Sequence, residues 1–187
     1  MLSISDKQYL LKTARIAIES AINDAVPATF NDCPSLLTKP CGAFVTLHEE
    51  GELRGCIGYT DAVRPLLQTV QEAAAKAATE DPRFTALTPD ELAMIEIEIS
   101  VLSPMKLVHN INEIEIGKHG LLIERKHSRG LLLPQVPVEY GWDVKTFLNQ
   151  TARKAGLRSS SWNDSETKLF TFTAEIFSEQ SVKPAAE

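Results

Sequence analysis

The sequence lacks the features on which several classes of protein depend. Its three cysteines, Cys33, Cys41 and Cys56, form no CxxC pair, which argues against a disulfide framework and a structural zinc site. No run of about 18 apolar residues that could span a membrane is present, and Met1–Leu11 lacks the apolar segment of a signal peptide. We therefore expect a cytoplasmic protein with reduced thiols and no membrane partner.

Positive charge is also in short supply. The chain has 19 lysine and arginine residues against 25 aspartate and glutamate residues, a net charge of -6. A protein that binds nucleic acid or an anionic membrane through a broad basic surface needs the opposite balance. Nucleic acid is therefore not an expected partner.

The familiar catalytic and cofactor-binding signatures are missing as well. The sequence contains no GxSxG elbow, no P-loop, no GxGxxG, no HExxH and no clustered histidine and carboxylate residues. The commonest hydrolases, nucleotide-binding proteins and metalloenzymes are thereby excluded. Neither a metal site nor a cofactor is expected.

What is present is the composition of an ordinary globular protein. Of 187 residues, 43% are hydrophobic, 24% are charged and 6% are aromatic. A chain of this size buries about 70% of the surface that it exposes when unfolded, so its core needs no disulfide or metal ion. A single domain over residues 1–187 is expected.

Periodicity and capping residues predict a mixture of helices and hairpins. A capping-box pattern at Ser5–Gln8 opens a helix over Asp6–Asn23, and Pro65 suits the first position of a helix that ends at Thr79. Gly51 supplies the positive φ of a hairpin turn. The other predicted elements are an irregular connection over Val26–Pro40, strands Ala43–Leu47 and Leu53–Tyr59, a helical turn at Thr88–Glu91, strand Ile95–Val101, a hairpin of Leu121–Ile123 and Leu131–Leu133 with its tip at Glu124–Gly130, a helix from Asp143 to Ala155, and strand Lys168–Phe177.

The order of these elements predicts the fold class. Hairpins stand where repeated βαβ units would be found in an α/β protein, and no internal repeat is present. The sequence therefore predicts an α+β fold built on a largely antiparallel sheet with flanking helices.

The segment Leu53–Gly58, LRGCIG, is the first candidate for a functional site. In a strand, Arg54, Cys56 and Gly58 share one face, with residues i and i+2 about 6.6 Å apart. A guanidinium at that distance favours the thiolate, so a functional Cys56 should titrate below the free value of about 8.5. Gly55 and Gly58 leave room beside the thiol for a ligand or another backbone. The alternative is a small buried cysteine in a crowded sheet.

The turn Asp81–Phe84, DPRF, is the second candidate. Its residues suit a turn that ends a helix, in which Asp81 accepts backbone N–H groups and Phe84 enters the core. The alternative is an anion-binding role for Arg83.

A locally basic region stands out in this acidic chain, at Lys118–Gly120 and Arg125–Arg129. A solvated hairpin tip accounts for the second stretch. His119 suits a proton donor or a hydrogen-bonding clamp, with a structural histidine as the alternative. Further along, two prolines in Leu133–Pro137 predict an extended segment that presents Gln135 among apolar neighbours, where it can line a cleft.

At these residues the sequence resembles the AMMECR domain family, whose bacterial and archaeal members are called AmmeMemoRadiSam system protein A. The similarity covers nearly the whole chain. The motifs that carry it are Gly42–Leu47, Leu53–Gly58, Asp81–Phe84, Ile97–Pro104, Lys118–Leu121, Leu133–Val136, Trp142–Asp143 and Lys154–Leu157.

The resemblance implies an α+β fold with a larger and a smaller lobe, a cleft between them, and the LRGCIG segment as the functional centre. It also implies a partnership with a Memo-type protein and a radical SAM protein. The segment Pro137–Gly141 departs from the family motifs, and we infer no function for it.

Two classes of function follow. In the first, Cys56 is the nucleophile or covalent acceptor of an enzyme or carrier, Arg54 favours its thiolate or binds an anionic substrate, and His119 transfers protons. In the second, a non-catalytic module holds a small acidic ligand or a protein partner. Its candidate binding residues are Gly55, Gly58, Asp81, Arg83 and Gln135. The shared strand face of Arg54 and Cys56 favours the first class.

Both classes make the same prediction about position. The LRGCIG strand is expected at the lip of a pocket that also receives side chains from Asp81–Phe84 and Lys118–Gly120.

Overall fold

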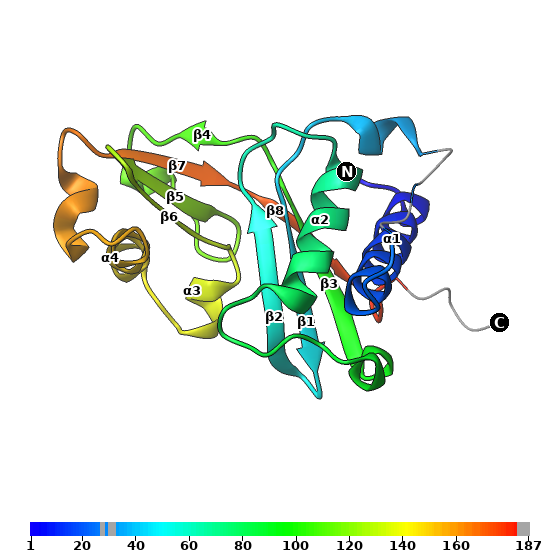
Figure 1. Ribbon diagram of the computed structural model, residues 1–187. Coiled ribbons are helices and arrows are strands. Elements are labelled where there is room, and N and C mark those ends of the chain that lie inside the picture. The colour runs from blue at the N-terminus through cyan, green and yellow to red at the C-terminus, as the bar shows by residue number, and fades with distance from the viewer. Residues whose placement is uncertain (27–28, 30–32, 183–187) are drawn as a thin grey trace. The chain divides into compact units, whose positions relative to one another are not determined.

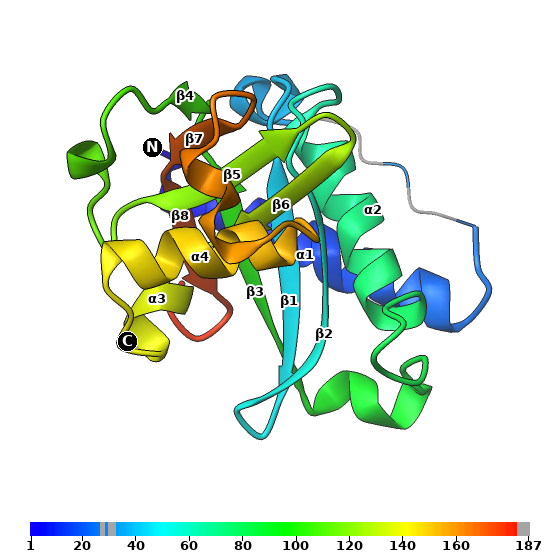
Figure 2. The same ribbon diagram turned by 90° about the vertical axis from the view of Figure 1, so that its left-hand side faces the viewer.

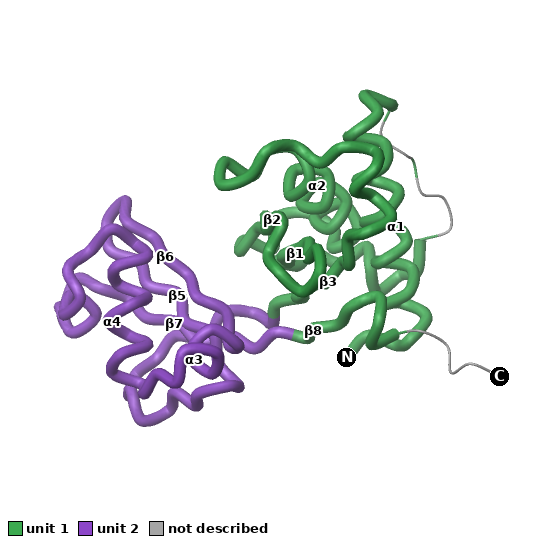
Figure 3. Tube along the Cα trace, turned by 90° about the horizontal axis from the view of Figure 1, so that it is seen from below, with its two compact units in different colours: residues 1–102, 175–187 green, residues 103–174 purple. Residues whose placement is uncertain are grey.

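The computed structural model describes residues 1–26, 29 and 33–182. The chain forms two compact units, the larger made of residues 1–102 and 175–187 and the smaller of residues 103–174, which Figure 3 shows in different colours. Each unit has a four-stranded sheet and a hydrophobic core of its own. The units are therefore described separately.

The larger unit is a sheet covered by two helices on one face (Figure 1). Its strand order is β2-β1-β3-β8, and β1 pairs antiparallel with both β2 and β3. The elements are α1 (Ile4–Ile22), β1 (Ala43–Glu49), β2 (Glu52–Tyr59), α2 (Leu66–Thr79), β3 (Ile95–Leu102) and β8 (Ala174–Ser178), with short 3-10 helices at Ser35–Thr38 and Pro89–Ala93.

Strand alternation builds the core of this unit. Val45 and Leu47 on β1 and Ile97 and Ile99 on β3 are fully buried on the face that the helices cover. The helices meet this face through small side chains, such as Ala77 of α2, which permit close packing. The opposite face of the sheet carries the polar positions of the same strands.

The smaller unit combines a second sheet with a helix that packs on it (Figure 2). Its strand order is β4-β7-β5-β6, with antiparallel pairs throughout. The elements are β4 (Lys106–Leu107), β5 (Gly120–Arg125), β6 (Ser128–Leu132), α3 (Val136–Glu139), α4 (Val144–Lys154) and β7 (Lys168–Phe172), with short 3-10 helices at Ile111–Glu113 and Ser159–Asn163. Leu121 and Ile123 of β5 form its core with Phe147 and Leu148 of α4.

The structure confirms the α+β class and several local predictions. The first hairpin has its turn at Glu50 and Gly51, both with positive φ. The Asp143 carboxylate accepts the Thr146 N–H at 2.7 Å and caps α4. Among the described residues, no helix combines the length and the apolar character needed to cross a membrane.

The start of the first helix differs from the prediction. Its capping box is formed by Ser3 and Asp6, and the Ser5–Gln8 pattern plays no capping role. The Ser3 Oγ accepts the Asp6 N–H at 3.1 Å, and the Asp6 carboxylate accepts the Ser3 N–H at 2.9 Å. The carboxylate also lies in the first turn, where the helix dipole favours negative charge. In the second helix, Pro65 is the N-cap residue, one place before the predicted position.

Three predictions in the second half of the chain are wrong. The hairpin turn is confined to residues 126 and 127, because β5 and β6 extend into the predicted tip. The predicted strand Lys168–Phe177 breaks at Thr173, and its halves join different sheets. The segment after Leu133 turns into α3, since Pro137 lies at the start of the helix, where its missing N–H costs nothing. Residues 27, 28 and 30–32 of the predicted irregular connection lie outside the described residues.

Candidate functional site

The LRGCIG segment makes up all of β2 except its two end residues, and β2 is an edge strand of the larger unit. Gly55 faces α2, because a Cβ at this glycine would lie 2.2 Å from the Ala77 carbonyl oxygen. Cys56 therefore points to the face of the sheet that the helices do not cover. On β1 the residue opposite Cys56 is Thr46.

The thiol of Cys56 is held by a cross-strand hydrogen bond. The Thr46 hydroxyl donates to Cys56 Sγ at 3.4 Å. Thr46 in turn pairs with Glu98 on β3, so the row across the sheet reads Cys56, Thr46, Glu98. The side chain at the centre of this row, Thr46, is buried. The row places a thiol, a hydroxyl and a carboxylate side by side.

The backbone of Cys56 is held from the other side by the DPRF turn. The Cys56 N–H donates to Asp81 Oδ2 at 2.8 Å, and the Cys56 carbonyl accepts from Arg83 Nη2 at 3.5 Å. Both backbone groups thus point away from β1, toward the position that a further strand would occupy. The turn takes the place of that strand and supplies hydrogen-bond partners for the backbone N–H and C=O of one edge residue, Cys56.

Asp81 is the centre of this arrangement. Its carboxylate accepts the Cys56 N–H, the Arg83 N–H and two further bonds from the Arg83 guanidinium at 3.0 and 2.7 Å. The guanidinium, followed by these backbone donors, holds the pKa of the Asp81 carboxyl far below its usual range. Its side chain is 2% exposed, whereas that of Arg83 is 53% exposed. The predicted backbone-capping role of Asp81 is confirmed, and part of the Arg83 guanidinium stays open to solvent.

The electrostatics of the thiol differ from the prediction for a functional cysteine. Burial raises the pKa of Cys56, and this effect outweighs the lowering by the Thr46 hydroxyl and by the charge of Arg83. The carboxylates of Asp81 and Glu98 raise it further. The resting thiol is therefore protonated near neutral pH, and any thiolate depends on Thr46 and Arg83.

The predicted pairing of Arg54 with Cys56 is wrong. Leu47 pairs with Gly55 but His48 pairs with Leu53, so Arg54 is the extra residue of a β-bulge, which redirects its side chain. The Arg54 guanidinium binds the Glu91 carboxylate at 2.8 Å and the Thr85 carbonyl at 2.9 Å. Arg83 takes the role beside the thiol that the sequence assigned to Arg54. A part for Arg54 in substrate binding stays a prediction.

Neighbouring protein atoms explain why residues 55 and 58 are glycines. At Gly55 the neighbour is the α2 backbone, which is one of the two predicted reasons for a glycine here. At Gly58 a Cβ would lie 2.3 Å from the ring of Phe44 on β1. Both positions need glycine for packing. Ligand binding at either one stays a prediction.

The remaining sequence candidates lie in the smaller unit. His119 Nδ1 accepts the Glu115 N–H at 3.1 Å, a bond that matches the structural alternative for this histidine. Gln135 lies in the turn before α3, and its Oε1 is buried without a hydrogen-bond partner in the described part of the chain. Because Cys56 belongs to the other unit, a pocket shared by Cys56, His119 and Gln135 stays a prediction.

Two residues that bind the predicted site residues, Thr46 and Glu91, were not predicted from the sequence. Thr46 carried a weak signal, because strand alternation places it on one face of the predicted hairpin, but the register against Cys56 was unknown. Glu91 carried none, since it follows Arg54 by 37 residues. Within the described residues, no group of three or more histidine, cysteine or acidic residues is placed to hold a metal ion.

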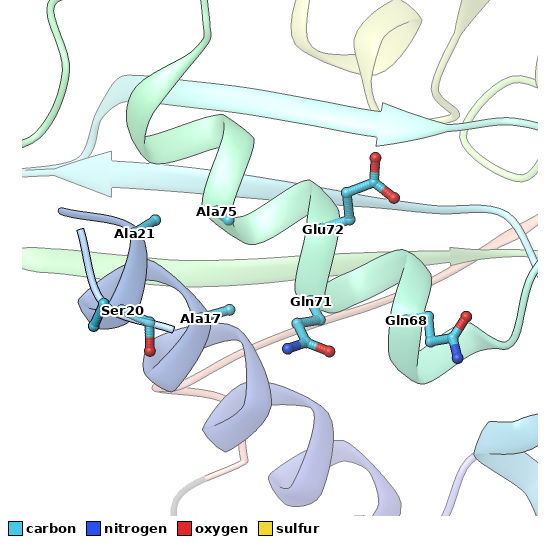
Figure 4. A pocket seen from close by; sticks show the side chains of 8 residues that line it. Ala17, Ser20, Ala21, Gln68, Gln71, Glu72 and Ala75 are labelled. Carbon is cyan, nitrogen blue, oxygen red and sulfur yellow. The ribbon is translucent and has the colours of Figure 1, made fainter. Parts of the chain in front are cut away.

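Three cavities have none of the sequence candidates among their lining residues. The first, of about 370 Å³, lies between α1 and α2, with Ala17, Ala21 and Ala75 on its walls and Gln71 at its rim (Figure 4). The other two, of about 190 and 530 Å³, lie in the smaller unit and share Ile111 and Trp162 as a common wall.

Comparison with known proteins shows a close set of relatives. The AMMECR1 family model matches residues 11–177. A protein of Methanothermobacter thermautotrophicus is 43% identical over 185 residues, which cover 95% of this chain and 96% of the relative. A protein of Thermococcus kodakarensis is 44% identical over 92% of this chain and 90% of its own length.

A solved structure has the same fold. The crystal structure of the uncharacterised protein PH0010 from Pyrococcus horikoshii matches with a TM-score of 0.90 and 37% sequence identity. The match covers 98% of this chain and 96% of that one.

Proposed function

Because the chain belongs to the AMMECR1 family, we propose that it acts in a cytoplasmic modification system together with a Memo-type protein and a radical SAM protein, with Cys56 as the centre of its active site. The partners follow from the resemblance of the sequence motifs to the AmmeMemoRadiSam proteins. The geometry around the thiol supports the choice of site.

One observation carries the choice of Cys56. The residue is fixed from two sides, with Sγ bound by the Thr46 hydroxyl and the backbone bound by Asp81 and Arg83. Burial of a carboxylate costs free energy, and here the buried Asp81 carboxylate fixes a single residue of the edge strand, Cys56. Functional groups need such positioning, because a reacting atom must be held in a narrow range of geometry.

The residues then take distinct roles. Cys56 Sγ is the nucleophile or covalent acceptor, and its thiolate is favoured by the Thr46 hydroxyl and the Arg83 guanidinium. Asp81 is a positioning residue, since it touches the Cys56 backbone and orients Arg83. His119 remains the candidate for proton transfer, and Arg54 the candidate for binding an anionic part of the substrate.

The test is a search for a covalent change on the chain. The protein is incubated with its Memo-type and radical SAM partners, S-adenosylmethionine and a reductant, and the peptide that contains Cys56 is analysed by mass spectrometry. We expect a new mass on this peptide that is absent in Cys56→Ser and present in Cys41→Ser. A new mass that persists in Cys56→Ser would contradict the assignment.

A non-catalytic module is the second candidate function, and the half-exposed Arg83 guanidinium favours it. In this case the site binds a small acidic ligand or an acidic segment of a protein partner, and the sulfur is incidental. Binding of either partner should then survive Cys56→Ala and fall in Arg83→Met. The first candidate predicts that Cys56→Ala abolishes the covalent change whatever its effect on binding.

A further inference from the structure

The largest of the three cavities lies wholly within the smaller unit. Its volume of about 530 Å³ falls in the range of about 300 to 1,000 Å³ that is typical of pockets for small organic ligands. Residues of the Ile111–Glu113 helix and the loop after it form one side, the first half of α4 forms the second, and Trp162 forms the third. The cavity therefore shares no lining residue with the Cys56 site.

The walls of this cavity are apolar and anchored. Ile114 and Leu148 are buried members of the hydrophobic core of the unit. The Trp162 indole is held by its Nε1–H, which donates to Asn149 Oδ1 at 2.8 Å. An indole fixed in this way presents a ring face of constant orientation. The cavity is thus formed before any ligand enters.

Two polar side chains line the cavity, the amide of Asn112 and the ammonium of Lys145. Lys145 is exposed and forms no salt bridge with any described residue. The pKa of the Asp143 carboxyl is lowered first by its hydrogen bonds with Thr146 and further by the Lys145 charge. That carboxylate is already engaged as the cap of α4. The Lys145 ammonium therefore forms no close ion pair with a described residue and can bind an anionic group.

The neighbouring cavity of about 190 Å³ gives a useful contrast. It shares Ile111 and Trp162 with the larger cavity but is lined by Asp164, whose carboxylate binds Arg125 at 2.7 Å. Among the described residues, no lysine or arginine lines the smaller cavity, whereas Lys145 lines the larger one and can attract a carboxylate ligand. The arrangement of charge thus selects one of the two cavities.

We propose that the larger cavity binds a small arylalkanoate, a carboxylate with an aromatic body. The aromatic body lies against Trp162 and Leu148, and the carboxylate binds the Lys145 ammonium. Ring stacking and apolar burial supply affinity, and the charge selects the carboxylate over neutral analogues.

The test compares phenylpropanoate with its neutral primary amide. The chain has two tryptophans, so Trp142→Phe leaves Trp162 as the fluorescent reporter. We expect saturable quenching of Trp162 by low-millimolar phenylpropanoate and weaker binding of the amide. Lys145→Met should weaken phenylpropanoate binding by about three- to fivefold, the size of a partly exposed ion pair, and leave the amide unchanged.

Two further variants separate the cavity from general effects. Lys118→Met removes an exposed lysine of the same unit outside the cavity and should leave binding of both probes unchanged. Val144→Phe fills the mouth of the cavity and should abolish binding of both probes, with the melting temperature reporting that the unit still folds. The proposal is overturned by an absence of saturable quenching, by equal affinity for acid and amide, or by unchanged affinity in Lys145→Met.

Discussion

At the scale of single residues, the site depends on which hydrogen-bond donors reach the sulfur of Cys56 and the carboxylate of Asp81. Cys56 Sγ has one close donor, the Thr46 hydroxyl, while Asp81 collects four donors on two oxygens. Burial opposes the thiolate, and the neighbouring donor and guanidinium favour it. The balance between these effects can be measured one residue at a time.

The Thr46 hydroxyl is the first of these to test. Thr46→Val keeps the shape of the side chain and removes the donor to Sγ, so the pKa of Cys56 should rise and alkylation at neutral pH should slow by about three- to tenfold. The measurement is the pH dependence of iodoacetamide labelling of the Cys56 peptide. Thr171→Val, on a strand of the smaller unit, is the matched control and should leave the rate unchanged. An unchanged rate in Thr46→Val would show that the Thr46 hydroxyl does not stabilise the Cys56 thiolate.

Asp81 gives a prediction about stability and pH. Asp81→Asn gives the Cys56 N–H and the Arg83 guanidinium a weaker hydrogen-bond acceptor. The substitution should lower the free energy of unfolding at pH 7 by about 2 to 4 kcal/mol. The folded pKa of Asp81 lies below the unfolded value of about 3.9, so its contribution is present above that value and is lost as pH falls through the folded pKa.

Denaturant unfolding at several pH values checks this sign. The stability difference between the parent and Asp81→Asn should be constant near neutral pH and should shrink below about pH 4. A difference that grows as the pH falls would mean that Asp81 is not the group that titrates.

At the scale of elements, the site depends on the close approach of α2 to β2. Gly55 permits this approach, since any side chain there would meet the Ala77 carbonyl. The turn that follows α2 then carries Asp81 to the edge of the strand. A change at Gly55 should therefore disturb both the packing and the site.

Gly55→Ala tests this dependence. The added methyl group forces the helix away from the strand and should cost about 3 kcal/mol of stability. Gly51→Ala is the comparison, because nothing lies within 4 Å of that position and only its φ of 86° opposes alanine, a cost of about 1 kcal/mol. Equal losses in the two variants, measured by denaturant midpoint, would show that the helix contact is not the constraint.

At the scale of the whole molecule, the smaller unit is inserted into the larger one between β3 and β8. Its two ends meet, because the Ser103 N–H donates to the Thr173 carbonyl at 2.8 Å and the Thr173 N–H donates to Ser103 Oγ at 2.9 Å. A segment with adjacent ends and its own core can close without the rest of the chain.

Residues 103–174 expressed alone should therefore fold. We expect a cooperative thermal transition by circular dichroism and a blue-shifted tryptophan emission that is lost on melting. Leu148→Ala should lower the midpoint clearly, since it opens a cavity in the core of this unit at a cost of about 2 to 5 kcal/mol. A featureless melt of the isolated segment would show that the unit needs the remainder of the chain.

The sequence predicted what depends on neighbouring residues and missed what depends on distant ones. The Asp143 cap and the strand alternation at Ile95–Val101 were predicted because each is set within a few residues. The partner of Arg54 was not, because a bulge in the pairing of β1 and β2 redirects its side chain. The division of Lys168–Phe177 between two sheets could not be predicted from the local pattern either, since apolar and polar residues alternate in the same way in both halves.

The candidate site shows the same division. Cys56 and Asp81–Phe84 were selected from residue types, and the structure joins them through the Asp81 carboxylate. The rise that burial causes in the pKa of Cys56 could not be predicted, because burial depends on the packing of the whole sheet. His119 and Gln135 belong to the other unit, and a site that they share with Cys56 stays a prediction.

The most direct test of the account replaces the sulfur of Cys56 in a strain that lacks the gene. The readout is the difference in small-molecule and protein-modification profiles between the deletion strain and its parent, measured by mass spectrometry. The account predicts that Cys56→Ala and Cys56→Ser accumulate and melt like the parent protein but fail to restore the parental profile, whereas Cys41→Ala restores it. Restoration of the parental profile by Cys56→Ala would contradict the account.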